Sequence, residues 1–212
     1  MIEQVMSEPG EGPQRPRYGP RAIHTHITRP VVQQLVNAKA HSVLDLGCGN
    51  GWFTGALDRC GFDVTGVDND EVVLRLARQF QPTLNLRQMD VMKPLDPNLA
   101  MRFDAVVAID LIDHVQMPRK MIETALAALK PGGLLAITSP FHGYVKNLLL
   151  ALGGRFDSRW DPLLDHGRMK FFSRATLTAL LTEFDLRDLH FETIGRIPTF
   201  ARSMLISVKT PQ

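Results

Sequence analysis

The chain has 212 residues, 44% apolar and 22% charged, and its 24 basic and 22 acidic residues give a formal charge of +2. This composition is typical of a globular domain with a buried core and excludes disordered, collagen-like and coiled-coil chains. The balanced charge gives no reason to expect a nucleic-acid partner. Cys48 and Cys60 form no zinc-binding or disulfide pattern, and no apolar run reaches the roughly 18 residues of a membrane span. The opening MIEQVMSEPGEGPQ also lacks the apolar core of a signal peptide, so we expect a cytoplasmic protein.

The first twenty residues are rich in proline and glycine, which sustain neither helix nor strand. We predict a flexible tail over 1–20 and a single domain over 21–212. Thr28 can cap a first helix, with Pro30 just inside its start.

From residue 41 onward, short leucine-rich or β-branched runs alternate with longer amphipathic segments, which predicts an α/β fold with a parallel sheet covered by helices. The predicted strands are 42–47, 63–68, 84–90, 103–110 and 133–139. The predicted helices are 51–60, 70–80, 117–130 and 174–184, the third ended by the Pro-Gly-Gly that follows it. Two further runs, 186–194 and 203–210, are close enough in sequence to pair antiparallel.

The interval 139–172 has no clean period beyond a short helix near 144–152. It is long for a connection inside a domain, and nine of the fifteen aromatic residues fall between Phe141 and Phe200. Open α/β sheets bind their ligands at the carboxyl ends of the strands. We therefore predict a substrate-side insertion at about 139–172.

A glycine-rich loop follows the first predicted strand, in the run Val-Leu-Asp-Leu-Gly-Cys-Gly-Asn-Gly over 43–51. Alternating glycines let the backbone turn sharply into a helix and approach a ligand closely. The dinucleotide fingerprint needs a third glycine where this chain has Trp52, so a nicotinamide-dependent oxidoreductase is disfavoured. By itself the loop is equally consistent with a tight structural turn.

Two acidic residues end the next two predicted strands. Asp68 follows Gly49 by nineteen residues, where a carboxylate can accept hydrogen bonds from both hydroxyls of a ribose. Asp90 ends the third strand, where a carboxylate can accept from an exocyclic amine. Asp70 is better explained as a helix cap. Each acidic residue alone is more often a cap or turn former, but three strand-end signals in order are much harder to obtain by chance.

These motifs, with Phe-Asp-Ala-Val-Val in the fourth strand and Leu-Lys-Pro-Gly-Gly before the fifth, resemble class I S-adenosylmethionine-dependent methyltransferases. Within that class the chain resembles the group that includes the ubiquinone-biosynthesis O-methyltransferases and many small-molecule methyltransferases. The resemblance implies a Rossmann-like, seven-stranded, mostly parallel sheet in the order 3-2-1-4-5-7-6, with strand 7 antiparallel and helices on both faces.

The resemblance also implies S-adenosyl-L-methionine as cofactor and S-adenosyl-L-homocysteine as product. Three regions of the cofactor would be contacted: the methionine part by the glycine loop, the ribose and adenine by the second and third strand ends, and the sulfonium by the fourth. The residues that these regions imply are Asp45, Gly47, Cys48, Gly49, Asp68, Asn69, Asp90, Val91, Ile109 and Asp110.

A hydroxyl acceptor needs a base, and three histidines are candidates: His114, His142 and His166. His114 follows the fourth strand in Asp-His-Val, His142 follows the fifth, and His166 lies in the insertion. Each is also compatible with a purely structural role. Asp110 and Asp113 have no later Asp-Asn pair to complete a magnesium site, so we expect no metal.

The sequence therefore predicts a methyltransferase acting on a small molecule, with a hydroxyl oxygen of an aromatic, quinone-like, sugar or natural-product substrate favoured. Methylation of carbon or nitrogen on a small molecule stays open, as does a non-catalytic cofactor-binding regulatory protein. The oligomeric state also stays open. The run after the fourth strand is Ile-Asp-Leu-Ile, unlike the Asn-Pro-Pro-Tyr of enzymes that methylate nucleic-acid amines.

Overall fold

A computed structural model of the chain describes residues 24–154, 169–195 and 201–211. The predicted tail at 1–20 lies outside these ranges. The described elements, in chain order, are α1 (His24–Asn37), β1 (Ser42–Leu46), α2 (Trp52–Arg59), β2 (Asp63–Asp68), α3 (Glu71–Phe80), β3 (Asn85–Gln88), the 3-10 helix η2 (Pro97–Leu99), β4 (Phe103–Ile109), α4 (Pro118–Ala128), β5 (Leu129–Pro140), α5 (Tyr144–Leu152), α6 (Arg174–Thr182), β6 (His190–Ile194) and β7 (Ser203–Lys209).

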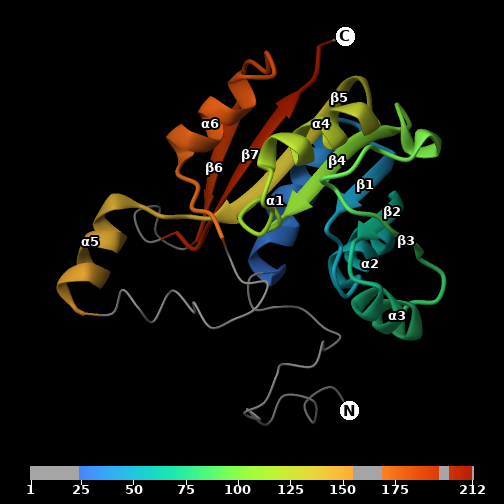
Figure 1. The fold of residues 1–212 in the computed structure, drawn as a ribbon, viewed down its shortest axis with the longest axis horizontal. Coiled ribbons are helices and arrows are strands. Elements are labelled where there is room, and N and C mark those ends of the chain that lie inside the picture. The colour runs from blue at the N-terminus through green and yellow to red at the C-terminus, as the bar shows by residue number, and fades with distance from the viewer. Residues whose placement is uncertain (1–23, 155–168, 196–200, 212) are drawn as a thin grey trace.

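The seven strands form one sheet in the order β3-β2-β1-β4-β5-β7-β6 (Figure 1). The pairs β1–β2, β1–β4, β2–β3 and β4–β5 are parallel, whereas β7 is antiparallel to both β5 and β6. This confirms the predicted fold class, including strand order and the reversed seventh strand. The carboxyl ends of the five parallel strands consequently lie at one edge of the sheet.

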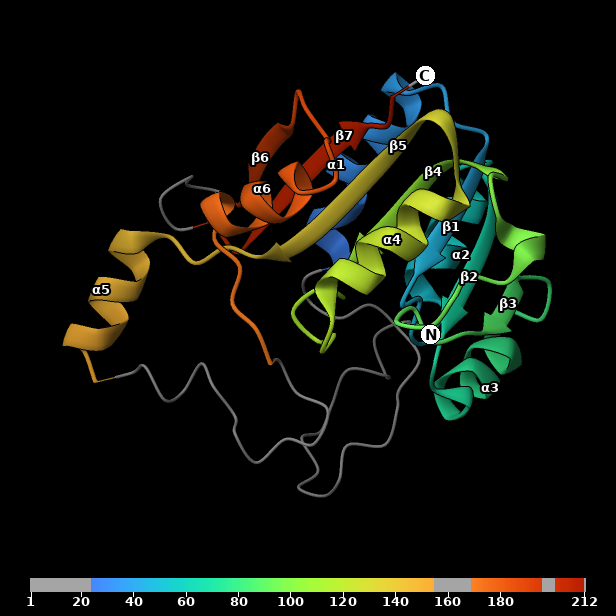
Figure 2. The same cartoon turned by 45° about the horizontal axis from the view of Figure 1, so that its top comes forward.

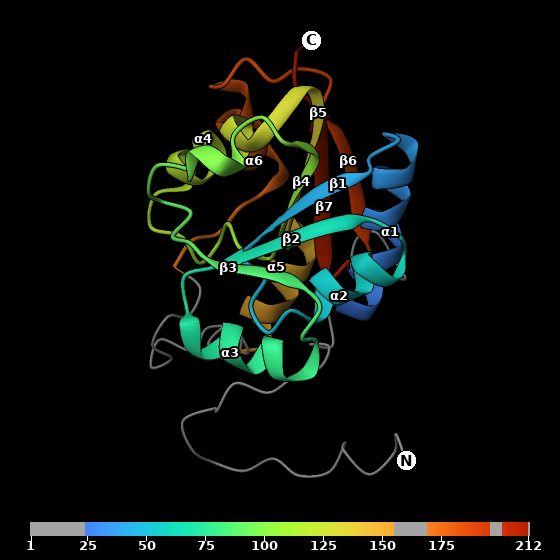
Figure 3. The same ribbon diagram turned by 90° about the vertical axis from the view of Figure 1, so that its right-hand side faces the viewer.

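Helices cover both faces of the sheet. α1 and α2 lie on one side, and α4 and α6 on the other (Figure 3). The central strands bury both faces: in β4, Val106 packs with the α4 side and Val107 with the α1 side. Such strands read as continuous apolar runs, which is why the sequence revealed them.

The first helix begins earlier than predicted. Thr28 and Pro30 lie inside α1, not at its start. Ile27, Val31 and Leu35 are all fully buried at a spacing of four residues, in one core cluster under the sheet. Burial of Ile27 therefore favours the additional turn over the local start signal at Thr28.

The fifth strand also begins earlier than predicted. α4 ends at Ala128, and Leu129 already pairs with Phe103. The next register pair joins Leu134 to Ala105, so the Pro-Gly-Gly run forms a bulge within β5 instead of a turn that precedes it. Gly132 has a φ of 72°, a conformation that glycine adopts without a steric penalty.

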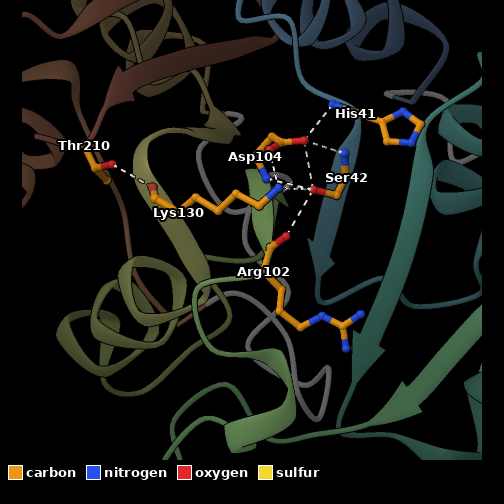
Figure 4. Close-up of polar contacts among 6 residues, drawn as sticks. All are labelled: His41, Ser42, Arg102, Asp104, Lys130 and Thr210. Carbon is orange, nitrogen blue, oxygen red and sulfur yellow. Dashed lines mark hydrogen bonds and ion pairs between the residues drawn. The ribbon is translucent and has the colours of Figure 1, made fainter. Parts of the chain in front are cut away.

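The amino ends of three strands are joined by Asp104, at the edge opposite the strands' carboxyl ends (Figure 4). Its Oδ2 accepts hydrogen bonds from the amides of His41 (2.9 Å) and Ser42 (2.8 Å), and its Oδ1 pairs with Lys130 Nζ at 2.6 Å. Partial burial acts to raise the pKa of Asp104, but the bonds from Lys130, Ser42 and His41 outweigh it and hold that pKa well below its usual range. The cluster therefore stabilises the fold at neutral pH.

Helix α5 projects away from the sheet beyond the end of β5 (Figures 1 and 2). The bounds of α5 match the helix predicted from the sequence. Its apolar side chains are largely exposed, Tyr144 by 80% and Leu152 by 76%. Among the described residues, no helix is both long enough and apolar enough to cross a membrane.

Candidate functional site

The glycine loop connects the end of β1 to the start of α2. Gly47, Gly49 and Gly51 have φ values of 70°, 53° and 71°, in the left-handed region that disfavours residues with a Cβ. The amides of Gly47 and Cys48 both donate to the carbonyl of Val67, at 2.8 and 2.9 Å. The loop is thus fixed against the carboxyl end of β2.

Asp68 links the glycine loop to the loop that follows β2. Its Oδ2 accepts from the Gly49 amide at 2.8 Å, and its Oδ1 accepts from the Asp70 amide at 2.9 Å. Burial raises the pKa of Asp68, while these two amides act to lower it. Asp70 in turn accepts from the Val72 amide and caps α3, as predicted. Asp68 is half-buried, and a carboxylate has further lone pairs for a ligand.

Asp45 lies beneath the loop and not on its surface. The residue is 1% exposed, and its Oδ2 accepts a hydrogen bond of 2.7 Å from the Thr54 hydroxyl on α2. Burial raises the pKa of Asp45 to about 7. Burial and the charge of Asp45 also raise the pKa of the Cys48 thiol, so this cysteine stays protonated at neutral pH and is a poor nucleophile.

The ends of β2 and β3 lie next to each other. The Met89 amide donates to the Asp68 carbonyl at 2.8 Å, and Gln88 Nε2 donates to the Asn69 carbonyl at 3.1 Å. Asp90 is half-buried and forms a local turn, in which its Oδ1 accepts from the Met92 amide at 2.9 Å.

Val91 and Ile109 are both buried, by contrast with exposed Asn69 at the end of β2. Val91 follows β3 and belongs to the core cluster on the α4 side of the sheet, whereas Ile109 ends β4 and belongs to the cluster on the α1 side. These two residues lie at the same edge of the sheet, Val91 beyond the carboxyl end of β3 and Ile109 at that of β4.

The segment after β4 completes this edge. Asp110 has a φ of 49°, and Thr138 binds it twice: the Thr138 hydroxyl accepts from the Asp110 amide at 3.0 Å and donates to Asp110 Oδ1 at 3.1 Å. The Leu111 side chain lies so close to Gly47 that a Cβ there would overlap it. The carboxyl ends of β1, β2, β3 and β4 therefore bring the predicted cofactor residues to one edge of the sheet.

The structure describes two of the three histidines that the sequence offered as candidate bases. His114 is half-buried in a turn closed by its amide, which donates to the Leu111 carbonyl at 2.9 Å. His142 follows β5, and its ring meets the ring of Phe171 edge-on with the centroids 5.0 Å apart. His166 lies outside the described residues. Of these candidates, His114 is on the same loop as Asp110.

Sequence reasoning missed the hydroxyl residues that hold the acidic ones. Thr54 binds Asp45, Thr138 binds Asp110, and Ser139 Oγ donates to Asp113 Oδ1 at 3.0 Å. Thr138 and Ser139 end an apolar run, and two hydroxyls at the carboxyl end of a buried strand are a signal that could have pointed to them. In the part of the chain that the structure describes, no group of three or more His, Cys, Asp or Glu side chains is arranged to hold a metal ion.

The sheet order, the glycine loop and the acidic strand ends are accompanied by a family match. Residues 20–190 match the family model described as a methyltransferase domain. The chain belongs to this family. It is a class I methyltransferase, an enzyme that uses S-adenosylmethionine as methyl donor.

Relatives of this methyltransferase include two ubiquinone biosynthesis O-methyltransferases. The one from Coxiella burnetii (strain Dugway 5J108-111) is 30% identical over 181 residues, which cover 82% of this chain and 76% of the relative. The one from Xanthomonas axonopodis pv. citri (strain 306) is 27% identical over 184 residues, covering 84% of this chain and 74% of the relative.

Two solved structures are similar in fold alone. A SAM dependent methyltransferase from Archaeoglobus fulgidus has a TM-score of 0.67 at 18% identity, covering 88% of this chain and 94% of that one. A possible histamine N-methyltransferase from Thermotoga maritima has a TM-score of 0.68 at 18% identity, covering 88% and 89%.

The glycine loop of this methyltransferase fits its cofactor. Among the described residues, and apart from Gly49 itself and its two chain neighbours, no heavy atom lies within 4 Å of the position that a Gly49 Cβ would occupy, so ligand atoms can approach the backbone there. At Gly51, by contrast, a Cβ would overlap Ala77 of α3, so that glycine serves the packing of α3 against the loop. An open, left-handed glycine beside a half-buried carboxylate suits a ligand that approaches the backbone closely and donates hydroxyl hydrogen bonds.

Proposed function

We propose that this methyltransferase transfers a methyl group to a hydroxyl oxygen of a small aromatic or quinone-like molecule. The observation that carries the proposal is the position of His114, four residues after Asp110 on the loop that follows β4. A half-buried imidazole at the carboxyl edge of the sheet is placed to act as a general base toward a bound hydroxyl. The O-methyltransferase relatives support the same acceptor chemistry.

The proposal assigns each strand end a part of the cofactor. The backbone of the Gly47–Gly49 loop, which includes Cys48, lies against the methionine part of the cofactor at the open position of Gly49, and Asp45 supports the loop from below. Asp68 accepts from the ribose hydroxyls beside Asn69. The adenine is contacted at the end of β3, and the sulfonium lies beside the end of β4; the residues are Asp90, Val91, Ile109 and Asp110.

When bound, the cofactor supplies a methyl group that is already strongly electrophilic. The protein's task is then to align the acceptor oxygen and to remove its proton. His114 takes that proton, a contribution of roughly 10²- to 10⁴-fold in rate. His142 and His166 are the alternative bases, and the insertion at about 139–172 selects the acceptor.

The first experiment establishes binding. Purified protein, freed of any copurified ligand, is titrated in a calorimeter with S-adenosylhomocysteine and separately with NADH. Micromolar binding of the first alone is expected. Binding of NADH alone, or of neither, would contradict the assignment of the glycine loop.

The second experiment tests the acceptor atom. The enzyme is incubated with S-adenosylmethionine and either 3,4-dihydroxybenzoate as catechol probe or histamine as amine probe, and the products are identified by mass spectrometry. A methyl ether of the catechol is expected, at a maximal rate that His114→Gln lowers at least a hundredfold with unchanged affinity for S-adenosylhomocysteine. Methylation of the amine alone would refute the proposal.

The matched variant for this test is His142→Gln, which removes the histidine that follows β5. If His114 is the base, His142→Gln keeps most of the maximal rate. The reverse pattern would transfer the role of base to His142.

The proposal also includes the setting of the enzyme: a small-molecule acceptor, no nucleic-acid partner and a cytoplasmic location. The two cysteines are both free thiols, Cys48 buried and Cys60 exposed, which is typical of a reducing compartment.

A further inference from the structure

Two consecutive hydroxyl residues at the end of β5 hold the loop that follows β4. Thr138 donates to Asp110 Oδ1 at 3.1 Å, and Ser139 donates to Asp113 Oδ1 at 3.0 Å. Thr138, Ser139 and Asp113 are at most 2% exposed. A buried carboxylate is costly unless it accepts hydrogen bonds, so the Ser139 hydroxyl is a substantial part of what keeps Asp113 in place.

The backbone of Asp113 holds a different segment. Its carbonyl accepts hydrogen bonds from the amides of Met169 (2.8 Å) and Lys170 (3.1 Å), where the chain returns toward α6. The chain leaves the sheet after Pro140, one residue beyond Ser139. One residue therefore contacts both the point at which the chain departs from β5 and the point at which it returns.

The residues that follow β5 and those that precede α6 are also in contact. His142, three residues after Ser139, meets the ring of Phe171 edge-on at 5.0 Å, and Phe172 is 8% exposed in the core cluster on the α4 side. His114 follows Asp113 directly in the chain. The departing strand, the returning segment and the turn that carries His114 thus meet at Asp113.

We infer that Asp113 is a positioning residue that ties both ends of the 139–172 interval to the turn that carries His114. Its side chain holds the outgoing end through Ser139, and its carbonyl holds the incoming end through Met169 and Lys170. The inference rests on the proposed function for its catalytic consequence: the placement of the base and the placement of the segment that selects the acceptor change together.

A purely structural role makes a different prediction. If Asp113 and Ser139 only contribute core stability, then removing their hydrogen bond lowers the protection of amides throughout the sheet. If Asp113 positions these segments, the loss of protection is confined to the Met169 and Lys170 amides, which donate to the Asp113 carbonyl, and to the turn that carries His114.

The test uses Ser139→Ala in the full chain, with Ser203→Ala as the matched control. Ser203 lies on β7 opposite Pro140, is fully buried, and its hydroxyl has no hydrogen-bond partner in the described part of the chain. Both variants therefore remove one buried hydroxyl at the same end of the sheet, and only the first removes a bond to Asp113.

Amide exchange followed by NMR is the first readout. Ser139→Ala is expected to speed exchange at Met169 and Lys170 about tenfold, the scale of one lost hydrogen bond, with amides of β1 and β7 unchanged. It is also expected to shift the His114 Cε1–H signal, identified by its absence in His114→Gln. Ser203→Ala should change neither.

Two further variants guard against an effect of Ser139 alone. Asp113→Ala should reproduce the exchange and the shifted signal of Ser139→Ala. Asp113→Asn keeps an oxygen that accepts from Ser139, so it should stay close to the parent protein. Unchanged exchange at Met169 and Lys170 in Ser139→Ala, or equal acceleration across the sheet, would overturn the inference.

Kinetics with 3,4-dihydroxybenzoate give the catalytic readout. Ser139→Ala is expected to raise the acceptor KM and lower kcat, each severalfold, while leaving the affinity for S-adenosylhomocysteine unchanged. If no catechol is methylated by the parent protein, the proposed function fails. The exchange and the histidine signal still decide the role of Asp113, so the two failures are distinguishable.

Discussion

Asp45 offers a sharp test of the electrostatics under the glycine loop. It is 1% exposed with a pKa raised by burial from 3.8 to about 7, and the Thr54 hydroxyl is its hydrogen-bond donor. The variant Asp45→Asn removes the charge and keeps a side-chain oxygen that accepts from Thr54. We expect it to change how the stability of the protein depends on pH.

The sign follows from proton uptake on folding. Between pH 3.8 and about 7 the folded protein holds a proton on Asp45 that the unfolded chain has lost. The stability that this raised pKa provides is fully present below pH 3.8 and is lost as the pH rises through 7. At about 1.4 kcal/mol per unit, the change from pH 5 to above pH 7 is about 3 kcal/mol, an order-of-magnitude value.

Urea denaturation at pH 5 and pH 8 measures this difference. Between these two conditions the parent protein should lose about 3 kcal/mol more unfolding free energy than Asp45→Asn. Asp63→Asn, at an exposed position at the start of β2, is the control and should follow the parent protein. Parallel pH dependences for the parent protein and Asp45→Asn would refute the reasoning.

Three further predictions concern other residues of the sheet edges. Asp68→Ala should weaken binding of S-adenosylhomocysteine by about 1 to 3 kcal/mol in calorimetry, and unchanged affinity would remove Asp68 from the site. Gly49→Ala and Gly61→Ala both place a Cβ in open space at positive φ, so each should cost about 1 kcal/mol of stability in urea, but only Gly49→Ala should weaken cofactor binding. Equal binding by the two would count against the loop as the cofactor site. Asp104→Ala should destabilise the protein at pH 7 by about 1 to 2 kcal/mol. Because the folded pKa of Asp104 is depressed, this loss should shrink as the pH falls below the unfolded value of 3.8, and a loss independent of pH would contradict the role of Lys130.

The features that sequence predicted well are those coded by neighbouring residues. The glycine loop over 47–51, Asp68 at the end of β2 and the apolar runs of the parallel strands are local patterns, and together they identified the fold; the third strand was predicted two residues too long at its carboxyl end, because Asp90 lies in the turn that follows β3. The short helix over 144–152 followed from the same kind of signal.

The features that were missed depend on residues far apart in the chain. The bond between Ser139 and Asp113 joins positions 26 residues apart, and only the register of β4 against β5 brings them together. Likewise, α1 extends past the start signal at Thr28 because Ile27 is buried under the sheet. Tertiary burial outweighs a local cap, and no window of sequence displays it.

The position of β7 between β5 and β6 affects how this protein is made. When the nascent chain has emerged from the ribosome only as far as β6, the strand that pairs with β6 has not yet been made. The edge of β5 that will pair with β7 then still has unpaired amides and carbonyls. Exposed strand edges invite pairing with other chains. The edge of β5 therefore stays unpaired from the emergence of β5 until that of β7, and this is the interval in which we expect chaperone protection to matter.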